Sequence, residues 1–384
     1  MIRTSASADV SAPTAPAVDA PIDSVSAAAF TVPTETPEAD GTLTWESTTM
    51  VVARVSAAGV TGIGWTYGPV AAMHVITEQL AAAVQGRSAL DVPGSNEAMS
   101  RAVRNAGRPG VAAEAVSAVD IALWDLKARI LGLPLVRLLG VARPDVPVYG
   151  SGGFTTYDDE QLEQQLRQWT EQQGVPRVKI KIGESWGSAE QRDLARTALA
   201  RRAIGDDVEL YVDANGGYTR KQAIRMAARL ADLGVVWFEE PVSSDDLPGL
   251  RQVRDAVPQD VAAGEYGYDL PYFARMLGAE AVDCIQADVT RCGGITVWLR
   301  AAALAQALGL QISGHCAPHA HAAAAASVPN LRHLEWFHDH TRIESMFFDG
   351  ALDPTGGAIR PGESGAPGLG LELRTAVANR YRVA

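Results

Sequence analysis

Apolar residues in the first third of the chain follow two successive patterns. Short runs typical of strands come first, at residues 24–32, 48–55 and 62–67. The segment 33–41 contains two prolines and three acidic residues, and we expect it to be a loop. Apolar positions with helical spacing follow at 73–84 and 116–126, before a Gly-Leu-Pro sequence at 132–134 ends the pattern. Three strands followed by helices predict a small α+β domain.

The region from about residue 146 to residue 335 alternates beta-like apolar runs with amphipathic helical segments. It opens at 146–149, and its further runs lie at 178–182, 208–212, 235–238, 261–263, 281–285, 310–313 and 332–334. Strands that alternate with helices pair in parallel, and this many units favour a closed barrel of about eight strands in about 250 residues. An open doubly wound sheet is the alternative, but no GxGxxG motif follows a first strand.

Acidic residues follow three of the predicted barrel strands at equal intervals. Glu239, in the sequence WFEEP, lies 26 residues after Asp213 and 26 residues before Glu265, about the length of one strand, one helix and two loops. Residues at the carboxyl ends of barrel strands face the active site, so the three acids should lie side by side. Converging carboxylates repel one another and call for a cation. Oxygen ligands favour Mg²⁺, with Mn²⁺ as the alternative. The competing interpretation, that each acid is a solvated loop charge, does not explain the equal spacing.

Two lysines precede the first of these acids by one repeat. Lys179 and Lys181 lie two apart on a predicted strand, so their side chains share a face. Two ammonium groups held close should lower each other's pKa, and burial should add to this, so that one lysine acts as a base near neutral pH. The alternative is a solvated basic edge strand.

A histidine and an aspartate end two later strand units. An Asp288 carboxylate bonded to one imidazole nitrogen of His315 would fix the tautomer and leave the other nitrogen as an acid or base. A purely structural histidine is the alternative. His319 and His321 are expected on a helix surface or around the site.

Composition limits the class of protein. The chain has 384 residues, 47% of them hydrophobic, which suffices for two domains or for a barrel with an added cap. Its net charge of −12 and the lack of basic runs argue against nucleic acid and anionic membranes. Three cysteines without a CxxC motif indicate neither a disulfide scaffold nor a zinc site, and they suit the reduced cytoplasm. No apolar run approaches the roughly 18 residues of a membrane span. Residues 1–20 lack the apolar core of a signal peptide and are expected to be a flexible tail.

These motifs together resemble the enolase superfamily, specifically its mandelate racemase subgroup. The likeness runs from about Ser24 to the C terminus and covers ALWDLK at 122–127, KIK at 179–181, DAN at 213–215, EEP at 239–241, Gly264-Glu265, Asp288 with Gly293-Gly294, His315 and Glu335. It implies a modified (β/α)7β TIM barrel at 146–350 and an N-terminal α+β capping domain at 21–145. The segment 351–384 would return to the cap. The resemblance also implies an even-numbered homo-oligomer.

The resemblance also assigns roles to residues. It implies Mg²⁺ held by Asp213, Glu239 and Glu265, the first acid of EEP being the ligand. Enzymes of this superfamily use a Lys or His base together with Mg²⁺ to form an enediolate. Here Lys181 would be one base with Lys179 as its electrostatic partner, and His315 with Asp288 the other acid or base. A protonated Glu335 would donate a hydrogen bond to the substrate carboxylate, and Asn215 would be a further contact.

Three functions remain open at this point. A polar rim of aromatic, histidine and acidic residues favours dehydration of an acid sugar, a small-molecule carboxylate, to a 2-keto-3-deoxy acid. Its members would be Tyr149, Tyr266, Tyr268, Glu335, Trp336, His338 and His340. Racemisation, epimerisation or cycloisomerisation of a substituted carboxylate would use the same enediolate, and the choice would depend on the loop at 33–45 and on the barrel loops. A binding protein without catalysis on the same fold is the remaining alternative.

Overall fold

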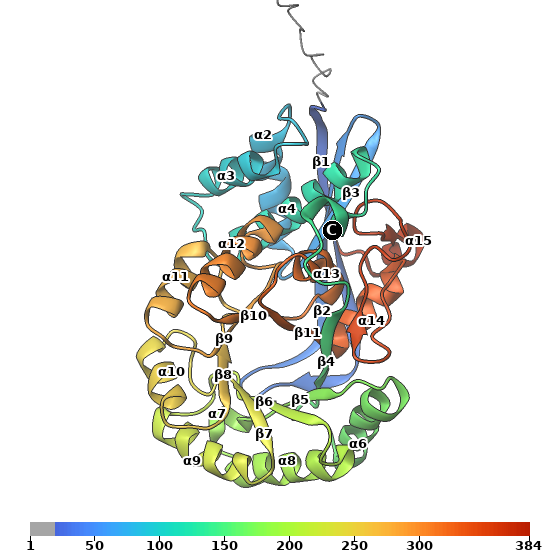
Figure 1. Cartoon of the computed structure of the whole chain (residues 1–384). Helices are drawn as coiled ribbons and strands as arrows, with labels where there is room; N and C mark the ends of the chain where they lie inside the picture. Colours follow the sequence, from blue (N-terminus) through green and yellow to red (C-terminus); the bar gives the residue numbers. More distant parts are fainter. Residues whose placement is uncertain (1–19) are drawn as a thin grey trace, which may run out of the picture.

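The computed structural model describes residues 20–384, so most of the tail expected at 1–20 lies outside the described residues. Ala20 itself is buried and accepts a backbone hydrogen bond from Ala89. In Figure 1 a ring of strands surrounded by helices carries a second, smaller unit at one end. Within residues 20–384, no helix combines the length and the apolar character needed to cross a bilayer.

The smaller unit is an antiparallel three-stranded sheet covered by helices, as predicted. Its sheet has the order β1 (Ile22–Ala39), β2 (Thr44–Ala57) and β3 (Val60–Tyr67). Its helices are α1 (Ala71–Val75), η1 (Ile76–Leu80), α2 (Ala81–Val84), α3 (Val92–Ala102), α4 (Val111–Ile130) and α5 (Leu135–Leu139). Helix α4 lies directly on β3. The approach is so close that a Cβ atom at Gly64 would come within 2.3 Å of the carbonyl oxygen of Ala118. The glycine therefore permits the close approach of helix and strand.

The prediction of a loop at 33–41 is wrong for most of that segment. Strand β1 continues to Ala39, and its pairing with β2 shifts register between Pro33 and Glu38. Proline is tolerated here because β1 is an edge strand, where a missing backbone N–H leaves no partner unpaired. The hairpin is further fixed by the indole Nε1 of Trp45, which donates to the Glu38 carboxylate at 3.0 Å.

The larger unit is a closed parallel barrel, which confirms the predicted fold class. Its strands are β4 (Val146–Gly152), β5 (Arg177–Lys181), β6 (Glu209–Asp213), β7 (Val235–Glu239), β8 (Asp260–Ala263), β9 (Cys284–Ala287), β10 (Gln311–Gly314) and β11 (Leu331–Phe337). Pairing of β11 with β4 closes the ring. The run predicted at 281–285 is displaced, because Asp283 leaves the strand and accepts from the backbone N–H of Val261.

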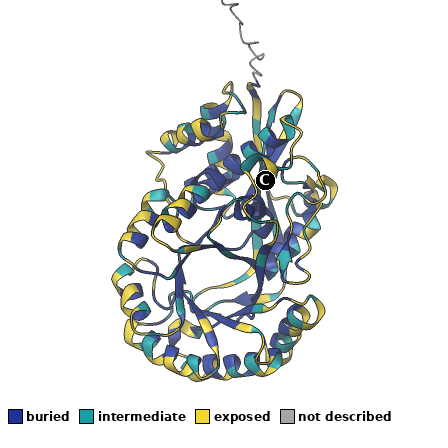
Figure 2. Cartoon of the chain, viewed as in Figure 1, coloured by how far each residue is buried: buried dark blue, intermediate teal, exposed yellow. Residues whose placement is uncertain are grey.

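Helices cover the outside of the barrel, where Figure 2 shows exposed outer faces and buried strands. They are α6 (Asp159–Arg167), η2 (Gln168–Gln172), α7 (Glu184–Gly187), α8 (Glu190–Ile204), α9 (Arg220–Ala231), α10 (Leu247–Arg254), α11 (Leu270–Gly278), α12 (Gly294–Ala307), α13 (Pro318–Ala326) and α14 (His338–Phe347). A buried cluster of Tyr149, Tyr211, Trp237, Ala262 and Cys284 fills part of the interior. The barrel is therefore packed rather than hollow.

The last segment crosses back to the cap. It contains β12 (Phe348–Asp349), β13 (Ala358–Ile359), β14 (Glu372–Leu373), α15 (Thr375–Ala378) and η3 (Asn379–Tyr381). Backbone hydrogen bonds join Ala29 of β1 to Val383 and to Ala384. The exact domain boundaries drawn at residues 145 and 350 stay predictions.

Buried hydrogen bonds fasten the cap to the barrel. The carboxylate of Asp120 on α4 accepts from the backbone N–H of Thr296 at 3.0 Å and from its hydroxyl at 2.6 Å. The Ser117 hydroxyl accepts from the N–H of Gly293, and the Thr66 hydroxyl donates to the carbonyl of Thr290. The cap is thus tied to the turn between β9 and α12 and to the first turn of α12, beside the carboxyl ends of the barrel strands.

Candidate active site

Three carboxylates meet at the carboxyl ends of neighbouring barrel strands. Asp213 ends β6, Glu239 ends β7 and pairs with it in register, and Glu265 follows β8. One oxygen atom from each lies within 4.8 Å of the others, and all three side chains are buried. The prediction that these acids lie side by side is confirmed.

The carboxylate cluster has the chemistry of a site for a hard divalent cation. Burial raises the pKa of Glu239, and the nearby Asp213 and Glu335 raise it further against the opposing effect of Lys179. Oxygen Oε2 of Glu265 is buried and has no hydrogen-bond partner among the described residues. Converging oxygens, one of them without a partner, fit Mg²⁺ or Mn²⁺, which bind oxygen ligands.

Both lysines of β5 point into this cluster, but their protonation differs from our expectation. The ammonium group of Lys179 contacts Glu239 and lies 2.7 Å from Glu335 Oε1, while that of Lys181 contacts Asp213. Burial lowers the pKa of each lysine, but the surrounding carboxylates outweigh burial and raise both pKa values above the usual range. The prediction that the two lysines have lowered pKa values is therefore wrong in this structure. Each ammonium group has a carboxylate partner, which the sequence pattern did not reveal.

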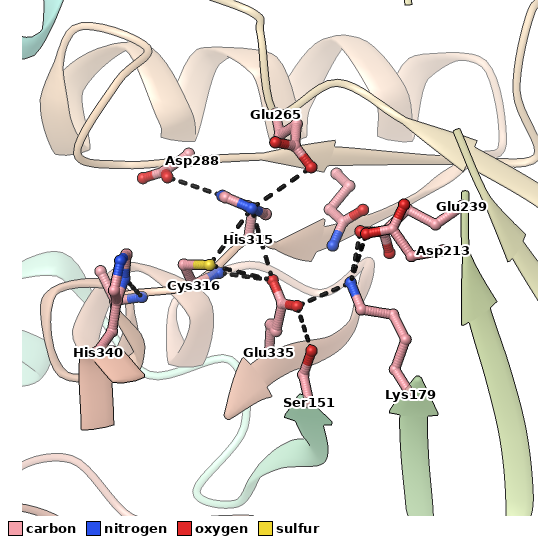
Figure 3. A network of polar contacts seen from close by, with 12 residues as sticks. Ser151, Lys179, Asp213, Glu239, Glu265, Asp288, His315, Cys316, Glu335 and His340 are labelled. Carbon is pink, nitrogen blue, oxygen red and sulfur yellow. Dashed lines mark hydrogen bonds and ion pairs between the residues drawn. The ribbon is translucent and has the colours of Figure 1, made fainter. Parts of the chain in front are cut away.

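His315 and Asp288 form the predicted pair. The Nδ1 atom of His315 lies 2.9 Å from Asp288 Oδ2, and both side chains are buried. Oxygen Oδ1 of Asp288 accepts from the N–H and from the hydroxyl of Thr290, each at 2.7 Å. Burial raises the pKa of Asp288, but the hydrogen bond and charge of His315 and the charge of Arg291 hold it below its usual range. The other nitrogen of His315 faces the centre of the site (Figure 3).

Glu335 lies between the lysines and the histidine. Its Oε1 accepts from the Ser151 hydroxyl at 2.6 Å, and its Oε2 accepts from the backbone N–H of Cys316 at 2.9 Å. Burial raises the pKa of Glu335, but the charges of Lys179 and His315 lower it by more. The pKa of Glu335 therefore lies well below its usual value. This direction of the pKa favours the carboxylate form while no substrate is bound, and the role of Glu335 as a donor to a substrate carboxylate stays a prediction.

Strained backbone surrounds the carboxylate cluster. Asn215 and Glu240 have φ values of 46° and 39°, just after β6 and β7. Such conformations are costly for residues other than glycine and concentrate at functional sites. The backbone N–H of Asn215 donates to Asp213 Oδ1 at 2.8 Å, so this turn also orients a carboxylate.

Asn215 and Glu240 line a cavity of about 560 Å³, with Thr42, Trp186, Tyr266, Tyr268 and Tyr272 on other walls. Lys181 and His315 do not line this cavity, so the cavity lies beside the carboxylate cluster and its lysine and histidine neighbours.

The tip of the β1–β2 hairpin reaches across the barrel from the cap. The carbonyl of Gly41 accepts from the backbone N–H of Trp186 at 2.9 Å. A Cβ atom at Gly41 would lie 2.6 Å from the carbonyl oxygen of Ile182, directly after the lysine strand. The hairpin therefore forms part of the wall around the site, and Thr42 at its tip lines the cavity.

Several neighbouring residues differ from expectation or were missed. Of the two places expected for His319 and His321, the helix surface is wrong, because both are buried. His321 lies around the site, where its Nε2 accepts from the backbone N–H of Val289, next to Asp288, and His319 Nδ1 is paired with Glu344. Tyr149 is not on the rim, because its ring packs inside the barrel beside Lys179. Ser151 was missed, and as a polar residue near the end of the first barrel strand it could have been found by the rule used for the others.

The fold and the site together define a class: a capped parallel barrel with a carboxylate cluster between a lysine pair and a histidine–aspartate pair. Residues 161–377 match the family described as Enolase C-terminal domain-like. Residues 24–140 match the mandelate racemase / muconate lactonizing enzyme N-terminal domain. The chain belongs to the mandelate racemase subgroup of the enolase superfamily.

Individual relatives agree with this assignment. A mandelate racemase/muconate lactonizing enzyme-like protein from Rubrobacter xylanophilus is 49% identical, with a TM-score of 0.91, and the match covers 94% of this chain and 100% of that one. L-talarate/galactarate dehydratase from Salmonella typhimurium LT2 is 32% identical over 303 residues, 77% of this chain and 75% of the relative. Its structure with Mg and L-lyxarohydroxamate has a TM-score of 0.87 at 27% identity and covers 99% of this chain and 98% of that one. A 3,6-anhydro-alpha-L-galactonate cycloisomerase from Streptomyces coelicolor is 33% identical over 281 residues, 72% of this chain and 77% of the relative.

Proposed function

We propose that this chain is a Mg²⁺-dependent acid-sugar dehydratase, which removes the proton next to a carboxylate and then eliminates the β-hydroxyl group as water. The observation that carries the proposal is the meeting of Asp213, Glu239 and Glu265 within 4.8 Å, between Lys181 and the His315–Asp288 pair. Dehydratases among the relatives support the choice of reaction.

In this proposal the three carboxylates hold the ion. When bound, Mg²⁺ supplies a positive charge that stabilises the enediolate oxygens and acts as a Lewis acid. Asp213 would then serve two cations, because the carboxylate that contacts Lys181 would also be a ligand of the ion. An ion on Asp213 would weaken the hold of this carboxylate on the Lys181 ammonium group. The lysine then becomes easier to deprotonate, as a base requires.

The chain's own groups divide the proton transfers. Lys181 and His315 reach the cluster from different strands, β5 and β10, so a bound substrate would have a base on either side. Lys181 takes the α-proton, and the carbon–hydrogen electron pair becomes part of the enediolate. His315 Nε2 then gives a proton to the departing β-hydroxyl, while Asp288 stabilises the imidazolium that precedes this step. The enol product tautomerises to a 2-keto-3-deoxy acid.

Lys179, Glu335 and Asn215 complete the proposed site. Lys179 pairs with both Glu239 and Glu335 and is the electrostatic partner of the base. Glu335 contacts the substrate carboxylate, and the arriving negative charge raises the Glu335 pKa, so that a proton can be shared between them. Asn215 Oδ1 is buried without a partner among the described residues, which suits a hydroxyl of the substrate. A homo-oligomer, a cytoplasmic location and the absence of nucleic-acid binding stay predictions.

A second candidate reaction is cycloisomerisation, racemisation or epimerisation. Bases on both sides of the substrate support it, because a proton removed from one face can return to the other. The cycloisomerase relative from Streptomyces coelicolor supports it as well. The same ion and the same enediolate serve this reaction, so only its products differ.

The test is incubation of the Mg²⁺-loaded protein with a pooled library of aldonates, uronates and aldarates in D₂O. A 2-keto acid assay and NMR report the products. A 2-keto acid supports dehydration, whereas deuterium at the α-carbon without loss of water supports the second candidate. Neither change with any acid sugar would contradict both reactions.

A further inference from the structure

A second group of ligand atoms lies around His315 Nε2, next to the three-carboxylate cluster. His315 Nε2 lies 3.3 Å from Cys316 Sγ, Cys316 Sγ lies 3.4 Å from Glu335 Oε2, and the nitrogen lies 3.8 Å from the same oxygen. All three side chains are buried. One nitrogen, one sulfur and one oxygen atom thus form a small triangle (Figure 3).

The size of this triangle matches a tetrahedral zinc ion. Zinc bonds of about 2.3 Å to sulfur and about 2.0–2.2 Å to nitrogen or oxygen place neighbouring ligands about 3.3–3.6 Å apart. The three distances above agree with this range to within about half an ångström. Sulfur also selects the ion, because Mg²⁺ prefers oxygen ligands and zinc accepts thiolate and imidazole.

The groups around the triangle are arranged as they are around zinc-binding histidines. A metal-bound histidine usually donates its other ring N–H to a carboxylate, which fixes the tautomer. Asp288 fills this position at Nδ1 of His315 and is itself held by Thr290. The Ser151 hydroxyl and the Lys179 ammonium group both contact Oε1 of Glu335. The other oxygen of Glu335, Oε2, is then the one that faces the triangle.

A fourth ligand is also within reach. Oxygen Oε2 of Glu265 is buried, has no hydrogen-bond partner among residues 20–384, and lies 3.4 Å from His315 Nε2. Cys316 and Ala317 have φ values of 50° and 38°, and the Cys316 N–H is bonded to Glu335. This strained turn holds the thiol against the histidine, although the proposed reaction has no use for a thiol.

We propose that His315, Cys316 and Glu335 form a binding site for a thiophilic divalent cation such as Zn²⁺, and that the bound ion stops proton transfer by His315. When the ion binds, the Cys316 thiol releases its proton to solvent and the thiolate sulfur bonds the ion. The His315 Nε2 lone pair, which the reaction needs as a proton acceptor, would also be donated to the ion. The binding stands on the geometry alone, whereas the inhibition rests on the proposed function.

The first experiment measures binding without any turnover. Co²⁺ is titrated into the purified full-length chain in the presence of a large excess of Mg²⁺, which occupies the three-carboxylate cluster. We expect a thiolate-to-Co²⁺ charge-transfer band with a stoichiometry of one ion per chain, which Zn²⁺ then displaces. The band should disappear in Cys316→Ser and persist in Cys292→Ala, a change to another buried cysteine. No band in the unmodified protein, or an equal band in Cys316→Ser, would overturn the proposal.

Two further measurements separate this proposal from the proposed function. X-ray absorption at the zinc edge of the unmodified protein should show one sulfur neighbour at about 2.3 Å, and a shell of oxygen and nitrogen alone would refute the site even if Cys316→Ser fails to fold. With a substrate in hand, Zn²⁺ should inhibit turnover at saturating Mg²⁺ at least tenfold more strongly in the unmodified protein than in Cys316→Ser. Equal inhibition of both would overturn the inhibitory role and leave the dehydratase proposal intact.

Discussion

Replacing Asp288 by asparagine should reverse the tautomer of His315. Oδ1 of Asp288 accepts two hydrogen bonds from Thr290, so the amide oxygen must occupy that position and the amide NH₂ must face His315 Nδ1. The opposite orientation would leave two buried donors unpaired, at about 1–3 kcal/mol each. The ring proton therefore moves to Nε2, which then cannot accept a proton from substrate.

The expected loss follows from these energies. A preference of about 2–6 kcal/mol for the wrong tautomer corresponds to a factor of about 30 to about 10⁴ at 1.36 kcal/mol per tenfold, and positioned acid–base groups contribute a similar factor. Exchange of the α-proton on the His315 side should fall by this factor, while exchange on the Lys181 side should persist. The assay is NMR of deuterium incorporation into acid sugars of both configurations at the α-carbon.

A matched control is Asp120→Asn, which makes the same change at another fully buried aspartate that accepts from Thr296. It should lower the melting temperature without a selective loss on either face. If Asp288→Asn slowed both faces equally, Asp288 would act through general packing, and if it slowed neither, His315 would not be a base.

Three further predictions concern the ion and the cap. Glu239→Gln removes one of three charged ligands and should weaken Mg²⁺ binding by about tenfold or more in titration calorimetry, and unchanged affinity would exclude Glu239 as a ligand. Mg²⁺ at about 100 times its Kd should stabilise the unmodified protein by about 2.7 kcal/mol, seen as a higher melting temperature that EDTA reverses; no shift would contradict the site. Burial and the charge of Asp339 raise the pKa of Glu38 to about 8, so its contribution to stability is complete below pH 4.5 and is lost as the pH rises through about 8. Glu38→Gln should therefore raise the melting temperature at pH 9 relative to the unmodified protein but not at pH 4, and equal shifts at both values would refute this.

The sequence predicts the barrel and the acids well because both depend on local repetition. Each barrel strand is a short apolar run, and the polar residue at its carboxyl end faces the site. Asp213, Glu239 and Glu265 can therefore be found from their equal spacing alone. The pKa shifts of Lys179 and Glu335 could not be found in this way. They depend on contacts between β5 and β11, which lie far apart in the chain. The extension of β1 through two prolines was also hidden, since only the sheet order shows that β1 is an edge strand.

The fastening of the cap restricts how a substrate can reach the site. Asp120, Ser117 and Thr66 hold the cap to the β9–α12 turn and the start of α12 through buried hydrogen bonds, so we expect the cap not to swing away as a rigid body. Movement is then left to the hairpin tip at 40–43, where Gly41 lies against Ile182, directly after the lysine strand. Amide hydrogen exchange should accordingly be fast at this tip and slow at the clamp. Replacing these four residues by other sequences would change which molecules enter, while the lysines, the carboxylates and His315 stay the same. Selectivity and chemistry could therefore be altered separately in this chain.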